Sequence, residues 1–233
     1  MQHQSITSRW KDDRELFELM RTRLFSAVVG DILDQLGYRH QFLPQAIKPI
    51  HDAMVIAGRA MPVLEADYFA DVGHLDLSNK TFGMLFEAID DLREDEIYVA
   101  TGASLRYALW GGLTSTRAKK LGAGGAILDG FHRDTTEILD RDFATFSRGS
   151  YAQDQAPRGK VVDWRVPVEI DGVRIGPGDI VFGDRDGALV IPRDVESQVI
   201  ELALRKAATE SQVRLAIEGG MSTVEAYARF GVM

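Results

Sequence analysis

Two adjacent residues, Arg133 and Asp134, stand at the point of the sequence best suited to chemistry. They lie near the end of the glycine-rich run WGGLTSTRAKKLGAGGAILDGFHRDT, Trp110 to Thr135. A guanidinium is a planar, permanently charged fork that matches a carboxylate, and a neighbouring carboxylate can bind a hard cation. The pair therefore indicates a site where an organic anion and a metal ion meet.

The glycines of this run have the outline of a nucleotide-binding loop but the wrong order. Such a loop has its glycines after a strand and at the start of a helix. Gly122, Gly124 and Gly125 instead follow a predicted helix and precede a predicted strand. We interpret them as helix termination and close helix–sheet packing, and neither a dinucleotide site nor an S-adenosylmethionine site is favoured.

Three predicted elements decide where the pair lies. Residues 97–100 and 126–128 predict strands and residues 114–121 the helix between them, which makes a βαβ unit with parallel strands. The helix then starts at the edge where both strands end. We therefore expect the turn before the helix and the Arg133-Asp134 pair along one edge of the sheet, where ligands of open parallel sheets bind.

The chemistry of that edge suits an anion beside a cation. A helix start offers unpaired N–H groups and the positive end of a dipole, and Gly111 and Gly112 allow close approach to the backbone. With Arg133 they predict a carboxylate cradle. Asp134 is placed to hold Mg²⁺, which keeps several waters, against a 2-oxo acid. The ion would act as a Lewis acid on the keto oxygen and stabilise an enolate.

Several of these residues have a purely structural alternative. An Arg-Asp pair in a loop is often simply solvated. His132 is expected to be an exposed loop side chain rather than an acid or base, and Asp184 and Asp186 are expected to form a turn rather than a metal loop. The remaining histidines show no metal-ligand spacing; they are His3, His40, His51 and His74.

The other elements surround this unit. Residues 12–25 predict a helix, with an apolar face of Leu16, Phe17, Met20 and Leu24. A second helix over residues 27–37 is expected to have Ser26 as its cap and Gly37 as its stop, which completes an N-terminal helical region, residues 1–37. Residues 54–63 predict a strand and residues 81–94 a helix.

The second half of the chain predicts strands and then helices. Residues 161–192 carry strand and turn signals, including the hairpin dipeptide Asp171-Gly172, and predict a β-rich second sheet. A long helix capped by Asp194 and a short helix after Gly219-Gly220 fill residues 194–233. The fold class expected is therefore α/β, with a central βαβ unit and long terminal helices.

Composition limits the partners. The chain has 233 residues, 27 basic and 35 acidic, so its net charge of −8 argues against nucleic acid as a direct partner. The absence of cysteine excludes thiolate nucleophiles and cysteine-ligated zinc. The sequence shows no signal peptide and no apolar run of membrane-spanning length, so we expect a cytoplasmic protein without a membrane partner.

The run from Trp110 to Asp134 resembles the signature of the RraA-like family, in which a W-G-x-L helix start is followed by a short helix, a buried strand and D-G-x-x-R-D. GDILDQLG and PGDIVFGDRDGALVIPRDV are similar to further segments of that family, and the resemblance covers most of residues 20–218. It implies the swivelling β/β/α fold, a single domain over residues 1–233, and a homo-oligomer that is a trimer or a dimer of trimers.

The resemblance also implies roles for residues. The family contains class II pyruvate aldolases, which act on 4-hydroxy-4-methyl-2-oxoglutarate and 4-carboxy-4-hydroxy-2-oxoadipate and also decarboxylate oxaloacetate. It also contains regulators that bind ribonuclease E. By position, Arg133 would hold the pyruvyl carboxylate and enolate, Asp134 would bind Mg²⁺ or Mn²⁺, and Glu210 would reach in from a neighbouring subunit. The implied substrate-binding turn consists of Gly111, Gly112, Leu113 and Thr114.

One departure from the family pattern bears on the reaction. Aldolase members carry an acidic residue where this chain has Gly112. The sequence predicts a divalent-metal-dependent carbon–carbon lyase that acts on a 2-oxo acid to give pyruvate, with decarboxylation favoured over aldol cleavage. The alternative is a non-enzymatic regulator that binds a protein partner such as a ribonuclease, and it would make Arg133 and Asp134 dispensable.

Overall fold

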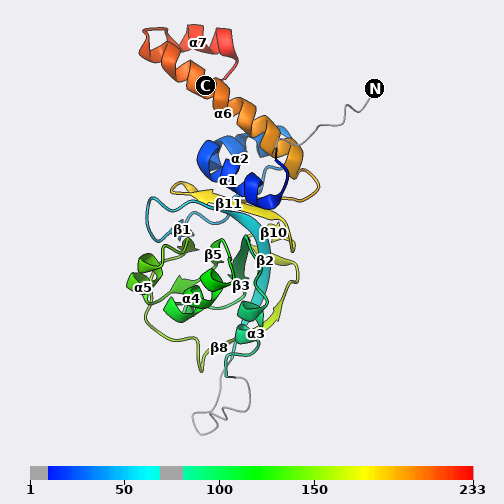
Figure 1. Ribbon diagram of the computed structural model, residues 1–233, viewed down its shortest axis with the longest axis vertical. Coiled ribbons are helices and arrows are strands. Elements are labelled where there is room, and N and C mark those ends of the chain that lie inside the picture. The colour runs from blue at the N-terminus through cyan, green and yellow to red at the C-terminus, as the bar shows by residue number, and fades with distance from the viewer. Residues whose placement is uncertain (1–9, 69–80, 233) are drawn as a thin grey trace.

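The computed structural model describes residues 10–68 and 81–232, which fold as a mixed α/β structure (Figure 1). The main sheet has eight strands, seven of them in the order β1-β7-β5-β3-β2-β11-β12, and β8 also pairs with β2. Because β12 returns to contact β1, the sheet nearly closes into a barrel. The strand bounds are Lys48–Pro49 (β1), Ile56–Asp67 (β2), Glu96–Thr101 (β3), Gly125–Leu128 (β5), Thr145–Ser147 (β7), Gly159–Trp164 (β8), Ile180–Asp184 (β11) and Gly187–Ile191 (β12).

The predicted βαβ unit is confirmed. β3 is followed by α4 (Gly112–Lys120) and then by β5, and β3 pairs in parallel with β5 on one side and β2 on the other. Every residue of β3 and β5 is buried, as expected of parallel strands covered on both faces. A Cβ on Gly125, where φ is +155°, would lie 2.5 Å from the carbonyl oxygen of Ala144, so this glycine allows close packing within the sheet rather than between helix and sheet.

Helices cover the sheet in two groups (Figure 1). One group packs on β11 and β12 over a core that includes Leu16, Phe17 and Met20, and the other lies over Tyr98 and Trp110. The first group is α1 (Asp13–Arg23), α2 (Ser26–Gln35) and α6 (Glu196–Glu218); the second is α3 (Leu85–Asp90), α4 and α5 (Thr135–Asp140). α6 runs out from the body of the molecule, and α7 (Thr223–Phe230) folds back against it.

Two predicted helix caps are wrong. Ser26 is the first residue of α2 rather than its cap, because its N–H and Oγ both donate to the carboxylate of Asp184, each at 2.7 Å. Asp194 lies in a turn closed by a hydrogen bond from Val195 N to Pro192 O, so α6 begins two residues later and has Val195 as its cap. The predicted stop at Gly37 is confirmed by its left-handed φ of +91°.

Four short strands were not predicted, of which β1 and β7 belong to the main sheet. β4 (Ala108–Trp110) and β6 (Phe131–His132) pair in parallel outside the main sheet. Residues 161–192 form strands as predicted, but the β-rich second sheet expected of them is wrong. β8, β11 and β12 pair with or next to β2 and so join the main sheet, while β9 (Val168–Ile170) and β10 (Val173–Ile175) form the hairpin at Asp171-Gly172. No helix within the described ranges is long and apolar enough to cross a membrane.

Candidate functional site

The β4–β6 pair brings the two predicted motifs together. Trp110 lies opposite His132 in the parallel register, and its carbonyl oxygen accepts a hydrogen bond from Arg133 N at 2.9 Å. Parallel strands end at the same edge, so Gly111 and Arg133 emerge side by side. The Trp110 indole N–H donates to Ser115 Oγ at 2.7 Å, which ties this edge to the first turn of α4.

The start of α4 already holds a carboxylate from the chain itself. Asp134 has left-handed backbone angles, φ 55° and ψ 42°, and its Oδ2 accepts a hydrogen bond from Gly112 N at 3.1 Å. Gly111 N donates to Thr114 Oγ1 at 2.9 Å. The carboxylate cradle predicted on these two N–H groups is therefore not open, because side chains of the protein already accept from them. Arg133 is the cationic group beside them.

Arg133 makes two loose ion pairs. Its Nε lies 3.8 Å from Asp134 Oδ2, and one terminal nitrogen lies 3.5 Å from Asp154 Oδ1. Both separations exceed the length of a charge-assisted hydrogen bond, and the side chain is 39% exposed. The guanidinium fork is therefore free to bind an incoming carboxylate on two nitrogens.

A cavity of about 240 Å³ lies against these residues. The predicted residues that line it are Gly111, Leu113, Thr114, Arg133 and Asp134, and Gly112 contributes through its N–H bond to Asp134. The lining residues that the sequence analysis missed are Phe82, Leu85, Phe86, Ala108, Leu109, Trp110, Asp154 and Gln155. The cavity thus combines a charged end with an apolar wall. Neither Asp154 nor Gln155 belongs to a motif that could have revealed it.

The prediction for His132 is wrong. This side chain is only 3% exposed, because β6 turns it inward against β7. Its Nδ1 is 2.8 Å from Ser147 Oγ and its Nε2 is 2.9 Å from Thr135 Oγ1. Burial lowers the pKa of the imidazole, so it is held neutral. His132 anchors the strand that carries Arg133 rather than lying in a solvated loop.

Two other predicted residues, Glu210 and Asp184, lie away from the cavity. Glu210 is on α6, where its carboxylate is 3.8 Å from Lys206 Nζ, and its role toward a neighbouring subunit stays a prediction. Asp184 forms the predicted turn, accepting from Asp186 N at 2.9 Å. His3 and His74 lie outside the described residues.

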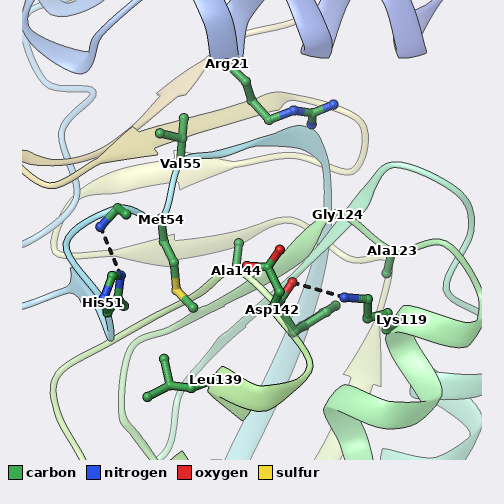
Figure 2. Close-up of a pocket in the computed structure, with 12 residues that line it drawn as sticks. Arg21, His51, Met54, Val55, Lys119, Ala123, Gly124, Leu139, Asp142 and Ala144 are labelled. Atoms are coloured by element: carbon green, nitrogen blue, oxygen red, sulfur yellow. Dashed lines mark hydrogen bonds between the residues drawn. The ribbon is translucent and has the colours of Figure 1, made fainter.

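A larger cavity, of about 700 Å³, lies at the opposite end of α4 (Figure 2). Its lining includes Arg21, His51 and Lys119, but none of the predicted site residues. Lys119 Nζ donates to the carbonyl oxygens of Arg141 and Asp142, and Arg21 donates to the carbonyl oxygen of Ala57 at 3.2 Å. Since these cations are bound to backbone oxygens, the smaller cavity at Arg133 is the better candidate for chemistry.

The oxygen donors at the Arg133 cavity fit a hydrated hard cation. Residues 10–68 and 81–232 contain no group of three or more His, Cys, Asp or Glu side chains able to hold a metal ion. The Asp134 side chain is 43% exposed, and Glu137 lies one helical turn further, against the same Gly111-Gly112 turn. Mg²⁺ commonly keeps several waters and binds one or two carboxylates. This arrangement matches that mode and not a tetrahedral zinc site.

A sequence profile of the RraA-like family, described as Aldolase/RraA, matches residues 26–190. That range includes the helix start at Gly111 and the Arg133-Asp134 pair. The chain belongs to the RraA-like family.

Two sequence relatives match most of this RraA-like chain. A protein of Halalkalibacterium halodurans named "Putative 4-hydroxy-4-methyl-2-oxoglutarate aldolase" is 28% identical over 183 residues, which cover 78% of this chain and 77% of that protein. Protein DlpA of Legionella pneumophila is 29% identical over 201 residues, which cover 86% of this chain and 31% of DlpA. The chain therefore spans about a third of the length of DlpA.

Solved structures share the fold. An uncharacterised protein of Pseudomonas syringae superposes with a TM-score of 0.81 at 24% identity, covering 96% of this chain and 99% of that one. Streptomyces coelicolor RraAS2 is described as an unusual member of the RNase ES inhibitor RraA protein family. It superposes with a TM-score of 0.74 at 21% identity, and the match covers 88% of this chain and 98% of that one. These likenesses confirm the predicted fold class.

Proposed function

We propose that this RraA-like protein is a divalent-metal-dependent carbon–carbon lyase that releases pyruvate from a 2-oxo acid. The observation that carries the proposal is the position of Arg133 and Asp134 at the charged end of one cavity, beside the start of α4. The name of the Halalkalibacterium halodurans relative supports an aldolase-type reaction.

Arg133 binds the carboxylate of the 2-oxo acid. Its fork makes only the two loose ion pairs with Asp134 and Asp154, and these two acids hold it at the cavity without occupying it with short hydrogen bonds. A bidentate pair fixes both the position and the plane of the substrate carboxylate. The adjacent keto group then lies toward Asp134.

Cleavage moves the electron pair of the C3–C4 bond into the 2-oxo group and leaves the enolate of pyruvate, which takes up a proton at C3. The fixed positive charge of Arg133 stabilises the negative charge of this enolate. A Mg²⁺ or Mn²⁺ ion held by Asp134 would supply Lewis-acid polarisation of the keto oxygen. Aldol cleavage would also require a base to remove the proton of the 4-hydroxyl, whereas decarboxylation requires none.

The apolar wall favours decarboxylation. Beyond the charged end, the cavity is bounded by side chains such as Phe82, Leu85 and Leu109. The C4 carboxylate of oxaloacetate loses hydration against such a wall and regains nothing from it, while the neutral carbon dioxide that it becomes suits the wall. The same wall offers no counter-charge to the second carboxylate of an aldol diacid. We therefore expect oxaloacetate to be a better substrate than 4-hydroxy-4-methyl-2-oxoglutarate.

Pyruvate release provides the test. The protein would be incubated with each of these two acids and Mg²⁺ or Mn²⁺, against a reaction that contains the metal ion alone, since free metal ions also decarboxylate oxaloacetate. Arg133→Ala is the test variant. Arg117→Ala is its control, because Arg117 pairs with Asp90 away from the cavity. Release no faster than with the metal ion alone, or equal rates in both variants, would refute the proposal.

A regulator that binds a protein partner is the alternative. The exposed apolar side chains of the α6–α7 arm, Leu215, Val224 and Tyr227, could serve such a contact or the expected trimer. If a ribonuclease binds and Arg133→Ala binds it equally well while no 2-oxo acid is turned over, the regulator is the correct function. Oligomeric state and cytoplasmic location stay predictions in both cases.

A further inference from the structure

A buried acid lies directly behind the wall of the Arg133 cavity. Glu65, on β2, is only 2% exposed. The pairing of β2 with β8 shifts register between Leu64 and Glu65. At this irregularity the strand presents the leucine to solvent and the glutamate to the interior, the reverse of what their polarity favours.

The surroundings of Glu65 suit a neutral carboxyl group. Its Oε2 accepts a hydrogen bond from Gln155 Nε2, while its Oε1 and the Tyr98 hydroxyl are buried without a partner among the described residues. An ionised carboxylate with a single hydrogen bond would be strongly destabilising there. Consistently, burial raises the pKa of Glu65 to about 8.

Gln155 links this acid to the cavity. It lines the cavity together with Arg133 and Asp154. Its backbone carbonyl accepts hydrogen bonds from the N–H groups of Arg158 at 2.6 Å and Gly159 at 2.9 Å. With the backbone fixed in this way, the bond to Glu65 decides how the amide is turned. Since Nε2 is bound to Glu65, the amide oxygen is the atom left for the cavity.

We propose that Glu65 is a positioning residue, whose neutral carboxyl group fixes the amide of Gln155 so that its oxygen accepts a hydrogen bond from a hydroxyl group of the ligand. The inference rests on the proposed function for the 2-oxo acid portion of that ligand, and it adds a hydroxyl group as a recognised feature. Ionisation of Glu65 would place a charge behind the wall. The phenols of Tyr98 and Tyr107 lie near the Glu65 carboxyl group, and both stay neutral at the pH where Glu65 ionises because their pKa values are raised. The Tyr107 hydroxyl donates to Asp67 at 2.9 Å.

Two substitutions separate this role from simple packing. Glu65→Gln keeps an oxygen that can accept from Gln155 Nε2, whereas Glu65→Leu removes it. Pyruvate and a 4-hydroxy-2-oxo monocarboxylic acid are the probes, each titrated calorimetrically with Mg²⁺ present. We expect Glu65→Leu to weaken binding of the hydroxy acid about tenfold, the worth of one hydrogen bond, and to leave pyruvate binding unchanged. Glu65→Gln should bind both probes like the parent.

A direct readout and a second variant complete the test. The parent should show the infrared carbonyl band of a protonated carboxylic acid at neutral pH, and this band should be absent from Glu65→Gln. If Glu65→Leu does not fold, Gln155→Leu at the cavity wall should give the same selective loss. Parent-like binding of the hydroxy acid by a folded leucine variant, or absence of the band, would overturn the proposal. Failure of the parent to bind pyruvate would instead overturn the proposed function, and the infrared result would still stand.

Discussion

The carboxylate of Glu137 occupies the space that a side chain on Gly112 would need. A Cβ built on Gly112 would lie 2.9 Å from Glu137 Cδ and closer still to its Oε2. The φ angle of Gly112 is outside the left-handed region, so the backbone itself permits a side chain. The acid that the family resemblance implies at this position has a counterpart here in a carboxylate from α5, that of Glu137.

This relationship changes what Gly112→Asp should do. Alone, the substitution displaces the exposed, flexible end of the Glu137 side chain, so it should cost no more than about 1 kcal/mol of stability, with little change in reaction preference. With Glu137→Ala the space is cleared, and the pair Gly112→Asp/Glu137→Ala should raise aldol cleavage relative to oxaloacetate decarboxylation. The ratio of the two rates is the measurement, in proteins of matched melting temperature. An unchanged ratio in the double variant would show that a carboxylate on residue 112 does not decide between the reactions.

Asp134→Asn tests the metal role. Asparagine tolerates left-handed backbone angles and can still accept from Gly112 N, so stability should change by less than about 1 kcal/mol. A neutral amide is a poor ligand for a hard cation, so activity and Mn²⁺ binding should both fall at least tenfold, by the usual preference of such ions for carboxylates. Asp140→Asn, an exposed change on the same helix, is the control. Normal Mn²⁺ affinity in Asp134→Asn would exclude Asp134 as a ligand.

Arg133→Lys keeps the charge and removes the fork. Because the guanidinium makes only loose ion pairs with Asp134 and Asp154, it can bind a carboxylate on two nitrogens, and we expect its replacement by lysine to lower kcat/KM roughly tenfold or more, mostly through KM. Arg117→Lys is a matched control on the surface of α4. Near-normal kcat/KM in Arg133→Lys would mean that charge alone suffices and that bidentate binding is not used.

Glu65 should make stability depend on pH. Its pKa is 4.5 when exposed and about 8 in the folded protein, so over this interval the native state keeps a proton that the unfolded chain has released. The stability that this group contributes is therefore complete below 4.5 and is lost as the pH rises toward 8, by about 1.4 kcal/mol per pH unit. Urea unfolding across this range should show a shallower decline for Glu65→Gln than for the parent, with Glu94→Gln as an exposed control. Parallel curves would mean that Glu65 titrates normally.

The parts of the fold that the sequence predicted are those with local signals. The β3–α4–β5 unit has apolar runs separated by glycines, and α1 has three buried apolar residues on one face, Leu16, Phe17 and Met20, so short-range patterns sufficed. β4 and β6 have three and two residues, too few for any periodicity, and their pairing joins segments more than twenty residues apart. Because this pair of strands was not predicted, His132 was expected to be exposed, whereas the pairing of β6 with β4 buries it.

Only those residues of the site that have a local signal in the sequence were predicted. Arg133 and Asp134 were found because they are adjacent and follow a strand. The hydrogen bond from Gly112 to Asp134 depends on a left-handed aspartate, which residue order alone does not reveal. Asp154 and Gln155 reach the cavity from an irregular segment, and Glu65 is a charged residue type at an inward position of β2, which its polarity alone would not predict.

The number of residues between Asp129 and His132 is constrained, because β6 fixes the direction in which the following side chains point. Side chains alternate along a strand, so His132 points inward and Arg133 comes next, at the cavity. Inserting or deleting one residue between Asp129 and His132 would exchange these directions, burying a guanidinium in the His132 position and exposing an imidazole at the site. Natural variation in chain length should therefore be absent from this stretch and collect in connections that do not end at the cavity.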